Sequence, residues 1–209
     1  MKEEILKYHL NRDKIFLIRN PISIKETRKD VIPVRIGADN LTLIFVGRLV
    51  YQKGIDRILH LLAISKNIEL IVVGEGNFKN KLLKKVKYLN IDDKIRFLGK
   101  ILKPYDLIAG SDYFILPSRY EGLPNCVLES LALGTPVIST KQIFALNDFK
   151  KNIANKSIML FESINEISKK IDFLEKRKDY KKPKLRKSLL IDYISPINFN
   201  KKINKIILK

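Results

Sequence analysis

The chain has 209 residues, of which 45% are hydrophobic and 30% charged, a composition typical of a globular protein with one core. Lysine and arginine total 41 against 22 acidic residues, so the net charge is +19. The single cysteine excludes an intrachain disulfide, and no apolar run reaches the ~20 residues that cross a bilayer. The charge suits nucleic acid, an anionic membrane or a phosphorylated ligand, and equally the codon bias of an AT-rich genome.

Short apolar runs alternate with helical patterns along the chain. The alternation predicts an α/β fold, a Rossmann-like parallel sheet with helices on both faces. The continuous apolar runs predict buried strands at 15–18, 41–47, 68–74, 94–99, 113–117, 136–139 and 157–161. Helical spacing predicts helices at 54–66, 77–89, 103–110, 124–133, 164–177 and 198–208.

One edge of such a sheet is the expected place for a ligand. Right-handed crossovers put the carboxyl ends of all parallel strands at the same edge, where folds of this class bind ligands. We therefore expect the turns after the strands to meet there, namely those after Val46, Val73, Leu98, Leu116 and Ser139.

Two cations follow the strand at 41–47. Arg48 comes directly after Gly47, and Lys53 stands just ahead of the next helix. A guanidinium binds phosphate with two parallel hydrogen bonds, and an ammonium acts as a compact point charge. The pair therefore predicts a phosphate site, with two solvated cations of a basic protein as the alternative.

Two further turns carry glycine. The segment VVGEGN at 72–77 contains Gly74 and Glu75 but has neither the dinucleotide nor the phosphate-loop spacing, so by itself it predicts only a tight turn. The segment RFLGK at 96–100 likewise places a glycine at a strand end.

The stretch RYEGLPNCVLESLALGTPVIST at 119–140 places two carboxylates around a short apolar helix. Glu121 precedes the helix and Glu129 lies on its second turn, so the pair can address two ends of one ligand. Alternatively, Glu129 is an exposed helix residue and Glu121 a partner of the helix dipole.

Residues at both ends of this helix fit their positions. Pro124 suits the first helical position and Gly134 the residue beyond the carboxyl end. Gly122 and Leu123 then stand at the amino end, where free N–H groups point outward. We interpret Cys126, which has no base nearby in the sequence, as a core residue.

The motifs GRLVYQKG, VGEG, FLG, PSRYEGLPNCVLESLALGTPVIST and SIMLF together resemble the C-terminal, donor-binding domain of family 4 glycosyltransferases with the GT-B fold. The resemblance covers about 41–175, and LIRNPIS at 17–23 is similar to the crossover into that domain. It implies a crossover remnant of an acceptor domain at 1–40, a nucleotide-sugar-binding Rossmann-like domain at 41–178 and a basic, helical tail at 179–209.

The resemblance also implies a reaction. Such enzymes transfer a sugar, with retention and without a metal or other cofactor, from a nucleotide-sugar donor to a glycan or lipid-linked acceptor. The expected donor is UDP-linked, and the expected pathway is cell-envelope polysaccharide or lipopolysaccharide synthesis. The implied catalytic residues are Arg48 and Lys53, which would hold the diphosphate, and Glu121, which would accept hydrogen bonds from the sugar. The implied nucleotide-sugar-binding residues are Gly47, Gly74, Glu75, Leu98, Gly122, Leu123 and Glu129, the last on the ribose hydroxyls.

Two departures leave alternatives open. Only about 20–40 residues precede the donor domain, so we expect either a transferase half that works with a separate acceptor-domain polypeptide or a nucleotide-sugar-binding module without turnover. The segment at 141–150 lacks the family's Gly-Gly turn, and we assign it no role.

Localisation follows from the same features. The segment 1–14 is charged throughout and lacks a signal-peptide core, so we expect a cytoplasmic protein, peripheral at most to an anionic membrane. Neither His9 nor His60 has a metal-ligand spacing. The aromatic residues are not interleaved with the charges, which argues against nucleic acid as a partner.

Overall fold

The computed structural model describes residues 20–37, 40–143, 146, 150, 157–163, 165–169, 186–190 and 196–207. The strand predicted at 15–18 lies outside these residues, as does most of the helix predicted at 164–177. Every other predicted helix and strand is present, with ends that shift by a few residues.

The described residues contain one sheet of six parallel strands, in the order β3-β2-β1-β4-β5-β6. The central strand β1 pairs with β2 along its whole length, from Leu41 opposite Ile68 to Val46 opposite Val73. Its other edge pairs with β4. The strand order reverses between β1 and β4, which makes this pair the switch point where open α/β sheets bind ligands. The strands are β1 (Leu41–Val46), β2 (Ile68–Val73), β3 (Ile95–Phe97), β4 (Tyr113–Leu116), β5 (Val137–Thr140) and β6 (Ile158–Phe161).

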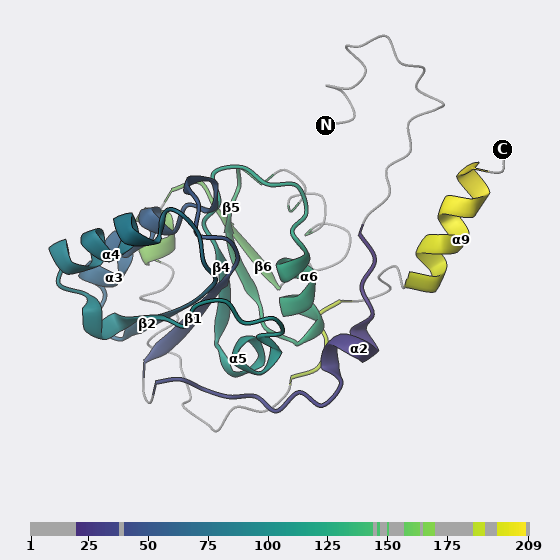
Figure 1. The fold of residues 1–209 in the computed structure, drawn as a ribbon, viewed down its shortest axis with the longest axis horizontal. Helices are drawn as coiled ribbons and strands as arrows, with labels where there is room; N and C mark the ends of the chain where they lie inside the picture. Colours follow the sequence, from purple (N-terminus) through teal and green to yellow (C-terminus); the bar gives the residue numbers. More distant parts are fainter. Residues whose placement is uncertain are drawn as a thin grey trace, which may run out of the picture.

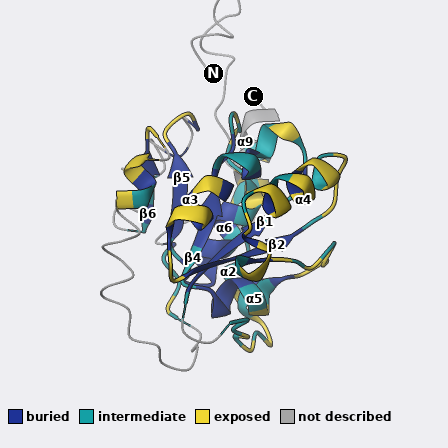
Figure 2. Cartoon of the chain, turned by 90° about the vertical axis from the view of Figure 1, so that its left-hand side faces the viewer, coloured by how far each residue is buried: buried dark blue, intermediate teal, exposed yellow. Residues whose placement is uncertain are grey.

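Helices cover both faces of the sheet, as predicted (Figure 1). One apolar cluster joins α3 and α4 to β1 and β2, and a second joins α5 and α6 to β4 and β5. The strands lie buried between these layers, and the outer faces of α3 and α4 are exposed (Figure 2). The helices are α2 (Ile24–Arg28), α3 (Leu59–Ile64), α4 (Lys79–Tyr88), α5 (Tyr105–Gly110), α6 (Asn125–Ala132) and α9 (Pro196–Ile207).

The helix predicted at 54–66 is shorter than expected. A 3-10 turn at Ile55–Arg57 precedes α3, which begins only at Leu59. Gly54 starts this turn in the left-handed region, at φ 68°, and a Cβ there would collide with the carbonyl oxygen of Pro117. Close approach of this turn to the end of β4 therefore sets where the helix begins, and the apolar spacing of the segment carries no sign of it.

The described part of the predicted crossover packs on the α5–α6 face. Arg28 of α2 donates from Nη1 to the carbonyl of Ala132 over 2.8 Å. The backbone N–H of Val34 bonds the carbonyl of Asp106 over 2.9 Å. Residues 20–37 thus continue the second apolar cluster, into which they place Ile22, Ile24, Val31 and Ile36.

Candidate functional site

The ends of β1, β2 and β3 meet through their backbones, as the sheet topology requires. Gly47 N–H donates to the carbonyl of Val73 over 3.0 Å, and Gly74 N–H donates to Gly99 over 2.7 Å. Gly74 has φ 145°, and a Cβ there would collide with the carbonyl oxygen of Gly47. Glycine is therefore needed at this position, because any side chain would push the two turns apart.

This junction forms the floor of a pocket of about 410 Å³, which we call the glycine pocket. Of the residues implied as nucleotide-sugar-binding, it contains Gly47, Gly74 and Glu75. Leu98 does not line it, and its N–H instead extends the sheet by donating to the carbonyl of Val72. The lining residues are Val46, Gly47, Arg48, Val73, Gly74, Glu75, Lys100 and Ile101.

A second pocket, of about 630 Å³, opens between the β1 turn and the amino end of α6. We call it the carboxylate pocket. It brings together Gly47, Arg48, Lys53, Glu121 and Leu123, which the sequence analysis placed in one site. Gly122 is exposed and does not line it. The other lining residues are Asn20, Val46, Pro124, Asn125 and Cys126.

Lys53 and Glu121 form an ion pair in this pocket. Nζ of Lys53 lies 2.5 Å from Oε1 of Glu121, and both side chains are only 12% exposed. Gln52 donates from Nε2 to the same carboxylate oxygen over 3.3 Å and to the carbonyl of Tyr120 over 3.0 Å. The pair thus holds Glu121 toward the pocket, and the prediction of Glu121 as a helix-dipole partner is replaced by this direct contact with a cation.

Arg48 differs from Lys53 because its guanidinium makes no ion pair or hydrogen bond with any residue that the structure describes. It is exposed and lines both pockets. A guanidinium without a partner, next to a second cation at a sheet switch point, is suited to bind a phosphate or diphosphate group.

A second ion pair supports the loop that carries Lys53. Arg119 contacts the carboxylate of Asp56 with both terminal nitrogens, at 2.9 and 2.7 Å, and the carbonyl of Tyr51 at 2.7 Å. Although burial raises the pKa of Asp56, the hydrogen bond and charge of Arg119 outweigh it and hold that pKa below its usual value. The carboxylate therefore stays ionised, and the pair fixes the β1 turn against the β4 turn.

The helix that follows Glu121 begins one residue later than predicted. Pro124 has extended backbone, φ −72° and ψ 137°, and is the N-cap, so α6 starts at Asn125. The free N–H groups of the first turn therefore lie at Asn125 and beyond, and both Asn125 and Cys126 line the carboxylate pocket. At the other end Gly134 follows the helix with φ 84°, as predicted.

Glu129 lies apart from the two pockets. It is half-buried in α6, and the Tyr105 hydroxyl of α5 donates a hydrogen bond to it. Burial raises the pKa of Glu129, although the Tyr105 hydrogen bond opposes the change. The reading of Glu129 as an exposed helix residue is therefore wrong. Its side chain stands one helical turn beyond Cys126, which does line the carboxylate pocket.

Cys126 is only partly the core residue that the sequence predicted. Its side chain packs against the second apolar cluster and also lines the carboxylate pocket. Burial, aided by Glu129 and Glu121 and opposed by Lys53, raises the pKa of this thiol to about 12. The base of the pocket is thus poorly solvated, although its mouth is polar.

Three contributors were missed by the sequence analysis. Gln52 stands directly before Lys53, but its contact with Glu121 bridges segments 69 residues apart. Asn20, which lines the carboxylate pocket, comes from the crossover segment. Lys100 could have been found, because it follows the β3 turn at the same sheet edge.

Among the described residues, no group of three or more His, Cys, Asp or Glu side chains could hold a metal ion. In the same part of the chain every helix is too short or too polar to cross a bilayer.

Comparison with known proteins identifies the family. The model of the family "glycosyl transferases group 1" matches residues 27–189. The chain belongs to this family. An uncharacterized glycosyltransferase of Methanocaldococcus jannaschii is 38% identical over 106 residues, which are 49% of this chain and 26% of that protein. The lipopolysaccharide 1,6-galactosyltransferase of Escherichia coli K12 is 32% identical over 146 residues, 66% of this chain and 40% of the relative.

Solved structures show the same fold. HepE of Anabaena in complex with UDP superposes with a TM-score of 0.78 at 16% identity, covering 99% of this chain and 61% of that one. A glycosyltransferase from Rickettsia africae gives a TM-score of 0.78 at 19% identity, covering 100% and 61%. The fold is thus that of one Rossmann-like half of a GT-B glycosyltransferase. The chain spans about three fifths of these structures and no more than 40% of the two curated relatives.

Proposed function

We propose that the chain is a retaining, metal-independent glycosyltransferase that takes its sugar from a UDP-linked donor at the glycine and carboxylate pockets. The acceptor is a glycan or lipid-linked saccharide of cell-envelope polysaccharide or lipopolysaccharide synthesis. The observation that carries the proposal is Arg48, a guanidinium without a partner among the described residues, which lines both pockets beside the Lys53–Glu121 pair.

The two cations have distinct parts in this proposal. Arg48 binds the diphosphate with two parallel hydrogen bonds, and Lys53 adds a fixed positive charge 2.5 Å from Glu121. Together they stabilise the negative charge that develops on the departing nucleotide, which is the task a bound Mg²⁺ performs in other sugar transferases.

The carboxylates bind hydroxyl groups. Glu121 already faces the carboxylate pocket, where Lys53 and Gln52 orient it toward the donor sugar. Glu129 binds the ribose hydroxyls after its side chain leaves Tyr105, because in its present place it lines neither pocket. The N–H groups at the start of α6 and near Leu123 contact sugar or phosphate oxygens.

The UDP specificity rests on likeness to relatives and on the glycine pocket. HepE, which has the same fold, was solved with UDP, and a relative 32% identical is named a galactosyltransferase of lipopolysaccharide. The glycine pocket is lined by Gly47 and Gly74, which have no side chains, and by the apolar Ile101, a lining that suits a pyrimidine ring.

The test is calorimetric titration of the purified chain with UDP, in the presence and absence of EDTA. We expect the same affinity for UDP in both buffers and a stoichiometry of one UDP per chain. No heat at millimolar UDP contradicts the donor assignment, and binding that EDTA abolishes contradicts metal independence. The anomeric configuration of any product, read by NMR, tests retention.

A non-catalytic nucleotide-sugar-binding module is the second candidate, because the two pockets that would hold the donor are formed by this chain's own residues. The chain covers 40% of the lipopolysaccharide galactosyltransferase that it resembles. Transfer of labelled sugar, by the chain alone or with a separate acceptor-domain polypeptide, supports the transferase. Normal UDP binding without transfer under either condition supports the module.

We also propose a peripheral position on the cytoplasmic face of an anionic membrane. The five lysines of α4 are spread over its exposed and half-buried positions, at Lys79, Lys81, Lys84, Lys85 and Lys87. Each cation at such a surface contributes about 1 kcal/mol to binding. Flotation with vesicles of anionic and of neutral lipid at physiological salt tests this, and absence from the anionic vesicles contradicts it.

A further inference from the structure

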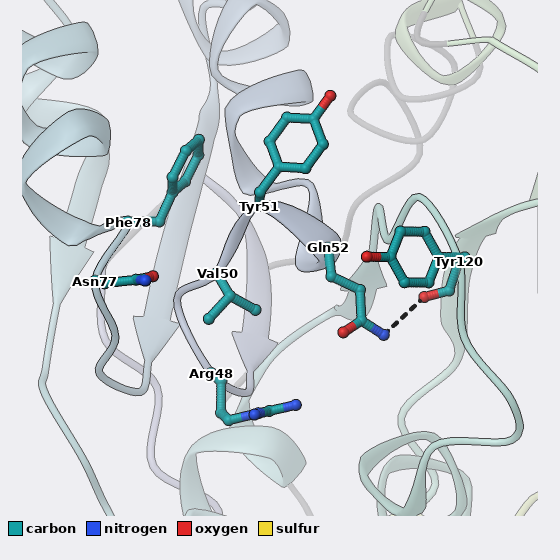
Figure 3. A pocket seen from close by; sticks show the side chains of 7 residues that line it. All are labelled: Arg48, Val50, Tyr51, Gln52, Asn77, Phe78 and Tyr120. Atoms are coloured by element: carbon teal, nitrogen blue, oxygen red, sulfur yellow. Dashed lines mark hydrogen bonds between the residues drawn. The ribbon is translucent and has the colours of Figure 1, made fainter.

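A third pocket, of about 510 Å³, lies beside the other two on the α3–α4 side of the β1 turn. We call it the aromatic pocket. Figure 3 shows Asn77 and Phe78 along one side, Gln52 and Tyr120 along the other, Val50 between them and Arg48 at one end. The lining residues are Arg48, Val50, Tyr51, Gln52, Asn77, Phe78 and Tyr120.

Two of its aromatic side chains are exposed, and one of these, Tyr51, is held in place by its neighbours. Tyr51 is 58% and Tyr120 62% exposed. The Tyr51 and Phe78 rings meet edge to face, with centroids 6.0 Å apart and planes at 76°. The Arg119 guanidinium, itself held by Asp56, lies 3.8 Å from the centroid of the Tyr51 ring. An exposed aromatic ring that an ion pair keeps in position, as Arg119 and Asp56 keep Tyr51, is typical of a binding surface.

The polar groups of the pocket are mostly uncharged. Gln52 and Asn77 supply carboxamides, and the Asn77 side chain has no hydrogen bond within the described part of the chain. Arg48 is the only cation among the lining residues. Arg119 lies over the Tyr51 ring and Lys81 lies 5.3 Å from the centroid of the Phe78 ring, so the exposed Tyr120 ring is the face offered to a ligand. An aromatic ring accepts the C–H face of a pyranose, and carboxamides both donate to and accept from its hydroxyl groups, so Tyr120, Gln52 and Asn77 match a neutral sugar ring.

A nucleobase fits this pocket less well. A base stacks between two parallel ring faces, whereas the planes of Tyr51 and Phe78 stand at 76° to each other. A phosphate would meet a single guanidinium here, while the carboxylate pocket offers Arg48 and Lys53 together.

The position of the pocket links it to the donor site. Arg48 lines all three pockets, and Gln52 lines the aromatic pocket while contacting Glu121 in the carboxylate pocket. A ring bound against Tyr120 therefore lies next to the place proposed for the donor sugar. We propose that the aromatic pocket is a subsite for a sugar ring of the acceptor, an assignment that rests on the proposed function and narrows the acceptor to a neutral pyranoside.

Saturation-transfer NMR tests the subsite. The probes are methyl α- and β-pyranosides of glucose, galactose, mannose and N-acetylglucosamine, each offered to the chain with and without saturating UDP. We expect a saturation-transfer signal from at least one glycoside, and we expect this signal to persist in the presence of UDP. Binding of that glycoside should be about tenfold weaker in Tyr120→Ala and in Asn77→Ala. Tyr88→Ala, which removes an 83% exposed tyrosine from the end of α4, is the matched control and leaves transfer unchanged.

UDP calorimetry on the same samples separates the two proposals. Normal UDP binding without a saturation-transfer signal from any glycoside overturns the subsite and leaves the donor assignment intact. A saturation-transfer signal that UDP abolishes places the sugar in the carboxylate pocket and also overturns the subsite. An equal loss of this signal in Tyr88→Ala overturns it too. Glycoside binding without UDP binding overturns the donor assignment on which the subsite depends.

Discussion

The two edges of the sheet both carry charged side chains, but they use them differently. At the amino edge Arg35 donates to both oxygens of Asp112 and, over 2.6 Å, to the carbonyl of Asn40. Asp112 also accepts the Thr42 N–H at the start of β1. At the carboxyl edge the guanidinium of Arg48 contacts no described residue with a hydrogen bond or ion pair and opens onto three pockets.

The difference separates charges that serve the fold from charges that serve a ligand. A buried or half-buried charge is costly unless it is paired, so the Arg35–Asp112 pair, 14% and 16% exposed, stabilises the loop ahead of β1. An exposed charge that keeps no partner contributes little to stability and stays available for binding. Lys53 lies between these cases, since it is paired with Glu121 and still faces a pocket.

The alkylation rate of the Cys126 thiol has the largest expected change and tests whether water reaches the base of the carboxylate pocket. Because its pKa is raised to about 12, only about one thiol in ten thousand is ionised at pH 8, where an ordinary thiol is about a quarter ionised. Alkylation by iodoacetamide at pH 8 should therefore be about a thousandfold slower than in the same chain unfolded in urea. Comparable rates in the two states would show that water reaches the base of the carboxylate pocket.

Arg48→Ala tests the unpaired charge directly. Loss of hydrogen bonds to a charged phosphate costs about 1.5–3 kcal/mol, so the dissociation constant for UDP should rise about 10- to 150-fold with no change in unfolding free energy. Arg96→Ala is the matched control, since Arg96 is the middle residue of β3, lines none of the three pockets, is 51% exposed and reaches Glu69 only at 3.9 Å. Equal loss of UDP affinity in both variants would show that Arg48 has no special part in binding.

Arg35→Ala should show the reverse pattern. It leaves the half-buried Asp112 and the Asn40 carbonyl without this donor, which lowers the free energy of unfolding by about 1–3 kcal/mol in urea titrations followed by circular dichroism. UDP affinity, measured by calorimetry on the folded variant, should not change. A weaker UDP complex with normal stability would place Arg35 in the binding site and break the comparison.

Glu129→Gln is expected to have the smallest effect, with opposite signs for binding and stability. UDP affinity at pH 7 should fall about two- to tenfold, because a carboxamide oxygen is a weaker acceptor for ribose hydroxyls.

Stability should change the other way. Burial raises the pKa of Glu129 in the folded chain, so the fold holds this proton more tightly than the unfolded chain, and stability falls as pH rises from the ordinary carboxyl pKa through the raised one. Glu129→Gln removes that cost, so the variant should be more stable than the parent at pH 7 and lose this advantage near pH 4. An advantage that persists unchanged at pH 4 would show that ionisation of Glu129 is not its cause.

Local spacing was sufficient for much of this protein. Continuous apolar runs and helical periodicity predicted the parallel sheet, its covering helices and the meeting of Gly47, Arg48 and Gly74 at one edge, because these depend on period and on the fixed hand of crossovers. The order of the motifs was sufficient for the family, since the match at 27–189 contains all five of them and only the crossover segment at 17–23 lies outside it.

Tertiary structure alone decided which side chains touch. Three contacts join segments more than 60 residues apart, for which local spacing carries no signal. They are the Lys53–Glu121 ion pair, the hydrogen bond from Gln52 to Glu121 and the hydrogen bond from Arg119 to the carbonyl of Tyr51. Tertiary structure also placed Glu129 against Tyr105, because a neighbouring helix acts on Glu129 from outside its own segment. The sequence thus determined which edge of the sheet is suited to bind a ligand, and the packing of distant turns determined how that edge is divided into pockets.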